Sequence, residues 1–204
     1  MSTTQRRQRE AAARRQTILS AGLRLFRRQG YARTTMPQIA AAAELAPGTL
    51  YLYFPSKEAL YVELLAAGYA RLNTRLARPA ASARPLRQRA AAMIDAFLDF
   101  ARERPEYFEI IFFVLQRERT GEWEQTFDRD QLARVRAQEA DCKSAAAEVL
   151  GQFAAGSAAQ RRHTVDAVWS MLCGVVEHFG GKPDFDAVAR QAREVIIAGI
   201  FSRR

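Results

Sequence analysis

The sequence predicts an all-α fold made of a small basic N-terminal unit and a larger apolar helical body. Alanine is abundant, whereas the 204 residues include only 11 glycines and 7 prolines. No alternating run of β-branched and polar residues is long enough to indicate a strand, and apolar residues recur at helical spacing. With 49% hydrophobic residues, a chain of this length can bury a sizeable core.

Helix signals begin after a short basic segment, residues 1–9, which we expect to be a flexible arm. Apolar residues at helical spacing predict a first helix over about residues 10–29, and Gly30 ends it. Thr35 and Gln38 lie three residues apart. This spacing fits the reciprocal hydrogen bonds of a capping box at the start of a short second helix.

A third and a fourth helix follow closely. Pro47 fits the first position of a helix over about residues 47–54, because the missing N–H of proline does no harm there. Ser56 is a suitable N-cap for a fourth helix over about residues 56–78. The small residues and prolines of the segment 79–85 then predict a linker.

The rest of the chain, up to residue 204, is expected to form a larger helical bundle. Its apolar residues recur at helical spacing, and there is no internal repeat of solenoid length. The helices predicted here cover about residues 86–103, 106–118, 122–151, 158–179 and 184–202.

Positive charge is concentrated in the first third of the chain. Residues 1–60 contain ten Lys or Arg against three acidic residues, whereas residues 61–204 contain 21 against 19. The net charge of +9 therefore lies mostly on the N-terminal unit. Such a basic module indicates a polyanionic partner, although a solvated arm that only aids solubility gives the same balance.

Two short helices separated by a three-residue break, within residues 35–54, form a helix-turn-helix pattern. In such a unit the second helix enters the major groove of duplex DNA, and the flanking helices contact phosphates. Glycine permits close approach, threonine can contact a base edge or a thymine methyl, and tyrosine or lysine can bind phosphates. The DNA-binding residues expected from this pattern are Thr35, Gln38, Pro47, Gly48, Thr49, Tyr51, Tyr53 and Lys57. Two alternatives stay open, namely that Thr35 and Gln38 only form the cap and that Tyr53 packs inward.

The stretch from Ile18 to Leu65, with LFRRQGYARTTMPQIA and GTLYLYFPSKEALY, closely resembles the DNA-binding unit of the TetR family of bacterial transcriptional regulators. The resemblance implies a homodimeric repressor that binds a palindromic DNA operator and releases it when a small-molecule effector enters the C-terminal domain. It also implies DNA contacts for the residues that match Thr35, Gly48, Thr49, Tyr51, Tyr53 and Lys57. We therefore divide the chain into an arm (1–9), a DNA-binding domain (10–55), a connecting helix (56–78) and a ligand-binding and dimerisation domain (79–204).

Three positions depart from the family pattern. Glu44 stands where the turn usually has glycine, and a left-handed conformation costs a non-glycine residue about 1 kcal/mol, so we expect a reshaped turn. Ala46 replaces the usual Ser or Thr cap, which removes roughly 1 kcal/mol of capping unless Pro47 offsets it. Pro37 occupies a position where some members place a base-reading arginine. The operator of a relative can therefore not be carried over to this chain.

The segment MIDAFLDFARERPEYFEIIFFVL, residues 93–115, is rich in aromatic residues at helical spacing. Most of these side chains must form the core, but ligand pockets are lined by the same residue types. The residues expected to bind a mostly apolar effector are Met93, Phe97, Phe108, Phe112, Trp123, Trp169 and Cys173. Glu109 either recognises a cationic or hydroxylated ligand or lies on the surface.

The last two predicted helices are expected to form a dimer interface. Residues 167–176 are apolar nearly all round, which indicates burial on more than one side. A single subunit could bury the apolar stripe of the last helix, but such a terminal stripe more often completes a four-helix interface. The expected interface residues are Val168, Leu172, Val188, Ala192, Val195, Ile196, Gly199 and Ile200.

The sequence contains no recognisable enzyme motif, since HExxH, GxSxG, P-loop and GxGxxG patterns are all missing. Cys142 and Cys173 are far apart and form no metal-ligand spacing with His163 and His178. We therefore expect no enzymatic activity, no cofactor, no metal and reduced, buried thiols. No apolar stretch reaches the roughly 18 residues of a membrane span, and the N-terminus lacks the apolar core of a secretory signal, which favours a cytoplasmic protein.

Two other functions stay open as alternatives to an operator-binding regulator. One is a nonspecific helical nucleic-acid-binding protein that uses only its basic arm. It does not require the large aromatic body, which makes it the weaker alternative. The other is a helical ligand carrier or sensor without operator binding. A footprint that protects one discrete duplex site excludes both.

Overall fold

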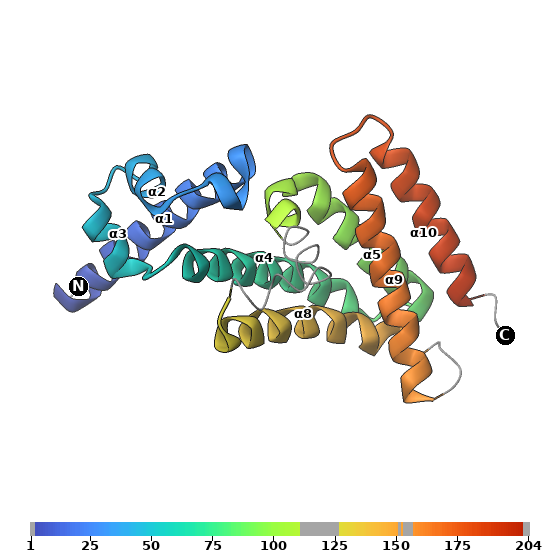
Figure 1. Ribbon diagram of the computed structural model, residues 1–204. Coiled ribbons are helices and arrows are strands. Elements are labelled where there is room, and N and C mark those ends of the chain that lie inside the picture. The colour runs from blue at the N-terminus through green and yellow to red at the C-terminus, as the bar shows by residue number, and fades with distance from the viewer. Residues whose placement is uncertain (1–2, 111–126, 151, 153–156, 202–204) are drawn as a thin grey trace. The chain divides into compact units, whose positions relative to one another are not determined.

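The structure is a computed structural model that describes residues 3–110, 127–150, 152 and 157–201. Every regular element within these ranges is a helix, which confirms the all-α prediction (Figure 1). The helices are α1 (Thr3–Arg33), α2 (Met36–Ala42), α3 (Pro47–Tyr53), α4 (Lys57–Ala80), α5 (Leu86–Glu103), α8 (Arg129–Leu150), α9 (Ala158–Phe179) and α10 (Phe185–Phe201). Residues 105–110 are helical as well.

The chain forms two compact units. The head unit comprises residues 1–66 and 109–134, and the body unit comprises residues 67–108 and 135–204. This division differs from the expected boundary at residue 79, because α4 passes from the head unit into the body unit at Ala66. It also assigns described residues of the C-terminal half, namely Glu109, Ile110 and residues 127–134, to the head unit, which no sequence signal indicated.

The first helix is longer than predicted. It begins at Thr3, so residues 3–9 are helical where we expected a flexible arm. An ion pair between Arg6 Nε and Glu10 Oε1, 2.8 Å apart, and three alanines after it favour helix in this segment. Gly30 has φ 80° and ψ 165°, so it interrupts the helix where the sequence predicted its end.

The core of the head unit joins the apolar faces of α1, α2 and α3 to the beginning of α4. Ile18, Ile39 and Leu50 are fully buried, one from each of the first three helices. Gly22 permits α1 to approach α4 closely, since a Cβ there would lie 2.7 Å from Cδ2 of Leu60. Within this core α2 contacts both α1 and α3 (Figure 1).

The body unit is a bundle in which α10 contacts both α9 and α5, and α5 also contacts α9 (Figure 1). Its centre is aromatic: the rings of Phe108 and Trp169 lie 5.1 and 5.2 Å from that of Phe97, both at edge-to-face angles. Helix α8 is joined to α4 by the buried thiol of Cys142, which donates to the carbonyl oxygen of Tyr69 over 3.5 Å.

Candidate functional site

The start of α2 has the capping box that the sequence predicted. Thr35 Oγ1 accepts from the backbone N–H of Gln38 at 3.4 Å, and Gln38 Oε1 accepts from the backbone N–H of Thr35 at 3.0 Å. The amide of Gln29 donates to the same Oε1 over 2.9 Å. Both capping residues are exposed and perform the structural role, while their contact with DNA stays a prediction.

The turn between α2 and α3 keeps its left-handed conformation instead of being reshaped. Glu44 has φ 56°, the sole positive φ at a non-glycine residue in the described part of the chain. The backbone N–H of Leu45 donates to the carbonyl oxygen of Ala40 over 2.9 Å, which satisfies an otherwise unpaired helix end. The left-handed conformation of Glu44 costs about 1 kcal/mol, and it directs the chain into α3.

Helix α3 is attached to the head unit by its inward side chains. Leu50 is fully buried and Phe54, just after the helix, is 2% exposed, as expected for two residues four apart on one face. The Arg15 guanidinium lies 4.3 Å from the Phe54 ring centroid and donates to the carbonyl oxygen of Tyr53 over 3.3 Å. Arg15 also pairs with Glu63 at 3.2 Å, so one arginine of α1 holds α3 and α4 together.

The opposite face of α3 is open to solvent. Tyr51 is 48% exposed and Leu52 is 85% exposed, and Pro47 and Gly48 are exposed as well. A Cβ at Gly48 would meet no atom within 4 Å. The other two predicted DNA-binding residues of this helix, Thr49 and Tyr53, are half-buried. Leu52 was not among the predicted DNA-binding residues, although its place between Tyr51 and Tyr53 is a usable signal.

Lys57 is engaged inside the head unit, and its predicted contact with DNA stays a prediction. Its ammonium donates to the carbonyl oxygen of Tyr31 over 2.9 Å and lies 4.1 Å from the centroid of the Tyr31 ring. The Tyr31 hydroxyl in turn donates to Oε1 of Glu58 over 2.5 Å. Residues Lys57 and Glu58 thus attach the start of α4 to the segment after Gly30, and the sequence did not reveal this because the partners are distant in the chain.

The carboxyl of Glu58 is held ionised by this network. Partial burial acts to raise its pKa, but hydrogen bonds from the Tyr31 hydroxyl, the backbone and Ser56, together with the Lys57 charge, outweigh burial. The net result is a pKa of Glu58 below its ordinary value.

Contacts of Ile110, Phe127 and Glu109 attach the described ends of the segment 109–134 to the rest of the head unit. The Tyr61 hydroxyl donates to the carbonyl oxygen of Ile110 over 2.7 Å, and the Phe127 ring lies 6.0 Å from the Tyr61 ring. Glu109 is exposed and pairs with Arg27 of α1 at 3.4 Å. Glu109 therefore lies on the surface, and its alternative role as a ligand-recognising residue is not supported.

The body unit contains a small apolar cavity of about 30 Å³. It is lined by Leu76, Ala90, Met93, Ile94, Phe97, Ala146, Val165, Val168, Trp169 and Leu172. Three of the predicted ligand residues, Met93, Phe97 and Trp169, thus line one cavity. Phe108 is buried against Phe97, and Cys173 is buried without lining it. Phe112 and Trp123 lie outside the described residues.

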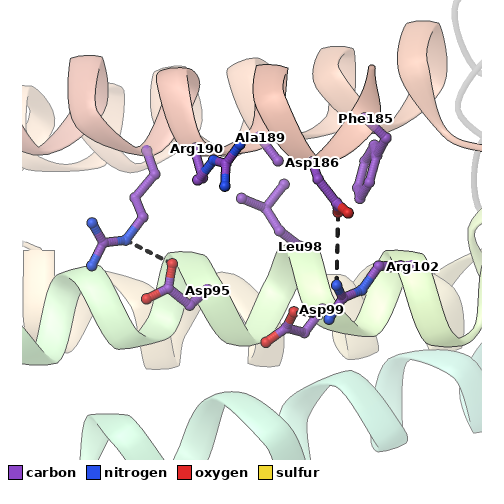
Figure 2. Close-up of a pocket in the computed structure, with 9 residues that line it drawn as sticks. Asp95, Leu98, Asp99, Arg102, Phe185, Asp186, Ala189 and Arg190 are labelled. Carbon is purple, nitrogen blue, oxygen red and sulfur yellow. Dashed lines mark hydrogen bonds and ion pairs between the residues drawn. The ribbon is translucent and has the colours of Figure 1, made fainter. Parts of the chain in front are cut away.

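A second depression of about 420 Å³ lies between α5 and α10 (Figure 2). It is lined by Asp95, Leu98, Asp99, Arg102, Phe185, Asp186, Ala189, Arg190 and Arg193. Arg193 bridges to Asp95 over 2.6 Å and Arg102 to Asp186 over 3.7 Å, so ion pairs cross the groove at two points. Its three acidic and three basic side chains balance in charge, which indicates a polar surface groove and no apolar ligand site.

The expected dimer residues separate into two groups. Val168, Leu172 and Ile196 are buried within the protomer and contribute to its core, so their part in an interface stays a prediction. Their helices pack on α5 and on one another, and this contact covers the side chains. The remaining residues are exposed or half-buried, namely Val188, Ala192, Val195, Gly199 and Ile200. Met171 of α9, which we did not predict, is 45% exposed, and Val195 of α10 is 56% exposed.

Both cysteines are free and buried, as predicted. Burial raises the pKa of Cys142 and of Cys173 to about 12, so both thiols stay protonated at neutral pH and are poor nucleophiles. The described residues contain no group of three or more His, Cys, Asp or Glu side chains that could hold a metal ion. Among the same residues, none of the helices has the length and apolar character to span a bilayer.

Family models match both parts of the chain. The model for bacterial regulatory proteins of the tetR family matches residues 18–64, over the helix-turn-helix. The model for the tetracyclin repressor-like C-terminal domain matches residues 90–196. Fold, turn geometry and these matches define an HTH-type transcriptional regulator with a helical C-terminal domain. The chain belongs to the TetR family, whose members bind DNA and small-molecule effectors, typically as dimers.

Relatives in sequence match the N-terminal part. The HTH-type transcriptional regulator RutR of Escherichia coli strain K12 is 43% identical over 65 residues, which are 32% of this chain and 31% of RutR. The HTH-type transcriptional repressor KstR of Rhodococcus jostii strain RHA1 is 44% identical over 66 residues, which are 32% of this chain and 31% of KstR. The chain thus spans about a third of the length of these relatives.

Solved structures resemble nearly the whole chain. The fatty acid degradation regulator FadR from Bacillus halodurans has a TM-score of 0.73 at 17% identity and covers 92% of this chain and 96% of its own. The TetR family regulator PfmR from Thermus thermophilus has a TM-score of 0.71 at 21% identity, with coverage of 88% and 96%. At such identities the likeness establishes the common fold alone.

Proposed function

We propose that this TetR-family regulator is a repressor without enzymatic activity, which binds a palindromic operator as a homodimer and is released by a small, mostly apolar effector. The observation that carries the proposal is the open face of α3. Leu50 and Phe54 fix the helix from one side, while Gly48 and Tyr51 are presented to solvent on the other. A rigid helix with an unoccupied face is what insertion into a major groove requires.

Gly48 supports DNA binding because nothing in the fold requires glycine at this position. A side chain would have open space there, and the residue does not have a positive φ. Glycine in a helix costs up to about 1 kcal/mol relative to alanine. Close approach of a DNA backbone to α3 explains why the smallest residue is present.

Charge supports the same conclusion. Most of the net charge of +9 lies in the first 60 residues, and α1 and α3 belong to this segment. Arginines that neutralise DNA phosphates release bound counterions, so affinity falls steeply as salt rises. Thr49 and Tyr51 then supply hydroxyls for base edges and phosphates.

Dimerisation through α9 and α10 is proposed from the exposed apolar residues of these helices. Met171 and Val195 are large apolar side chains on the surface, and added Cβ atoms at Gly174 and Gly199 would meet nothing within 4 Å. Small residues at such positions let a second pair of helices approach closely. A dimer places two α3 helices on two half-sites, which a palindrome provides.

The effector is proposed to bind at the apolar cavity of the body unit. A volume of about 30 Å³ has room for about one water molecule, whereas ligand pockets measure roughly 300–1,000 Å³. An effector must therefore enlarge the cavity by displacing its walls. One wall residue is Leu76 of α4, and the same helix begins at Lys57 in the head unit. Movement of α4 thereby links effector binding to the DNA-binding helices.

The test is a comparison of duplexes by fluorescence anisotropy and footprinting with the full-length protein. We expect one discrete protected site in the DNA upstream of its own gene, with dimer stoichiometry and an affinity that decreases steeply with salt. A scrambled duplex of the same composition is the control. Equal affinity for the two duplexes would overturn the proposal and favour a nonspecific nucleic-acid-binding protein.

A further inference from the structure

Leu52 is the most exposed of the large apolar side chains in the described residues, with 85% of its surface open to solvent. A single exposed leucine is common on protein surfaces and needs no explanation by itself. Here the position gives it meaning, because Leu52 is one helical turn from both Gly48 and Thr49, at spacings of four and three residues. Residues so spaced share one face of a helix.

This face has a particular shape. Side chains on a helix lean toward its N-terminus, so Leu52 leans over the turn that contains Gly48. A Cβ at Gly48 would meet nothing within 4 Å, so the space beside Gly48 on this face is open. Leu52 beside Gly48 thus forms a small raised apolar surface, the apolar step, on the face of α3 that includes the residues expected at the base edges.

The chemistry of the step selects its partner within the major groove. The thymine C5-methyl is the one apolar group that the base edges present there. Leucine has no donor or acceptor, so a cytosine amine or guanine carbonyl placed against it would lose water without gaining a hydrogen bond. Contact with a thymine methyl, in contrast, removes apolar surface from water, which stabilises the complex.

We propose that Leu52 is a specificity-determining residue that contacts a thymine methyl in each half-site of the operator. The proposal rests on the proposed function, since it needs α3 in the major groove. It adds the base and the chemical group that this position of the helix selects. Leu52 discriminates by apolar contact, and the charged residues of the head unit supply affinity without sequence preference.

The experiment removes the methyl group from the DNA and its partner from the protein. The probe is a palindromic duplex selected from a random-sequence library with the wild-type protein, in which symmetry-related thymines are replaced pairwise by deoxyuridine. Burial of one methyl corresponds to roughly fourfold in affinity, so one such pair should weaken wild-type binding by about fifteenfold. Leu52→Ala should bind the unmodified duplex more weakly and show no further loss from that deoxyuridine pair.

Two variants separate Leu52 from its neighbours. Thr49→Ser removes the one other methyl group on this face and should keep the full deoxyuridine effect. Tyr51→Phe removes a phosphate-binding hydroxyl and should weaken all duplexes equally, again with the effect intact. Leu52 is exposed, so Leu52→Ala should leave the circular dichroism spectrum and Tm unchanged.

The outcomes distinguish the two proposals. If wild-type protein prefers its selected duplex over a scrambled one but no deoxyuridine pair weakens binding, the inference about Leu52 is overturned and operator binding stands. The inference also fails if Leu52→Ala loses as much as wild type at every thymine pair. If selection yields no preferred sequence at all, the proposed function itself fails.

Discussion

At the scale of single residues, the network around Tyr31 shows how the head unit uses one side chain for several contacts. The Tyr31 ring lies under the Lys57 ammonium and its carbonyl accepts from the same group. Its hydroxyl donates to Glu58, and its ring stacks on Phe26 with 5.6 Å between centroids. Cation, carboxylate and aromatic partners are thereby all satisfied around one residue, which stabilises the junction between α1 and α4.

The lowered pKa of Glu58 makes this junction sensitive to acid. A carboxyl whose folded pKa lies below its ordinary value of 4.5 stabilises the fold above that value and loses the contribution as pH falls through the folded pKa. Tyr31→Phe removes the hydrogen bond and keeps the ring. We expect a loss of about 1 kcal/mol at neutral pH, since the carboxylate is half exposed, and a smaller loss near pH 3. Urea unfolding at several pH values measures both. A pH-independent difference would show that ring packing causes it.

Gly48 allows fold and function to be separated at one position. Gly48→Ala and Gly48→Val add side chains in space that the protein leaves open, so the free energy of unfolding should stay equal or rise slightly with alanine. Operator affinity should fall progressively, by on the order of tenfold or more for valine, because the side chain keeps DNA away from α3. Thermal unfolding and anisotropy measure the two effects. Retained affinity in both variants would place the DNA elsewhere.

At the scale of elements, predictions succeeded where a local signal sets the boundary. The predicted helix 86–103 coincides with α5, and 158–179 coincides with α9, where Ser157 and Gln160 form a capping box. Gly30, Thr35 and Pro47 also act where the sequence placed them. Caps and breakers function through neighbouring backbone groups, so the sequence contains the information they need.

The sequence was less informative where burial depends on distant partners. The stripe of the last helix was visible in sequence, but which of Val195 and Ile196 faces the protomer depends on α9 and α5. The spacing of Lys57 suggested a DNA contact, and it could not show that the ammonium also binds the carbonyl oxygen of Tyr31, 26 residues earlier in the chain. Spacing shows that a face is apolar or charged, and it does not show what covers that face.

The N-terminus of α3 offers an element-scale test of capping. Ala46 is its N-cap and makes no side-chain hydrogen bond, so Ala46→Ser should stabilise the head unit by about 1 kcal/mol. Thr35→Ala removes a cap that is present on α2 and should cost a similar amount, which makes it the matched control of opposite sign. Chemical denaturation measures both. If serine at position 46 brings no stabilisation, Pro47 at N1 already satisfies this helix start.

At the scale of the whole molecule, the proposed dimer depends on the surfaces that the protomer leaves exposed. Val195 and Ile196 are adjacent in sequence, yet 56% of one and 3% of the other are open to solvent. Ile196 packs in the core of its own protomer, whereas Val195 has surface that a partner can cover. The pair therefore distinguishes an interface effect from a folding effect.

Val195→Glu should abolish dimerisation while leaving the protomer folded. Ile196→Glu should instead destabilise the protomer, by on the order of 3 kcal/mol, because it buries an unpaired charge. Sedimentation should give monomers for the first variant, and operator affinity should fall because linked half-sites are lost. Val195→Thr, which keeps the shape and adds no charge, is the control. A Val195→Glu protein that stays dimeric would exclude this residue from the interface.

Effector release tests the coupling of the two units. Ala146 lines the apolar cavity on α8, and Ala140 lies exposed on the same helix. Ala146→Leu should fill the space and reduce the response to an effector, while operator binding by the free protein stays unchanged, and Ala140→Leu should respond like wild type. The probe is a compound that raises the wild-type Tm in a screen of hydrophobic molecules.

Coupling is reciprocal, so a compound that weakens operator binding tenfold, about 1.4 kcal/mol, must itself bind tenfold more weakly to the operator complex. Tryptophan fluorescence titrations with and without operator measure this ratio. An equal response from Ala146→Leu would move the effector site out of this cavity, and a ratio of one in the wild type would mean that the compound does not act on DNA binding at all.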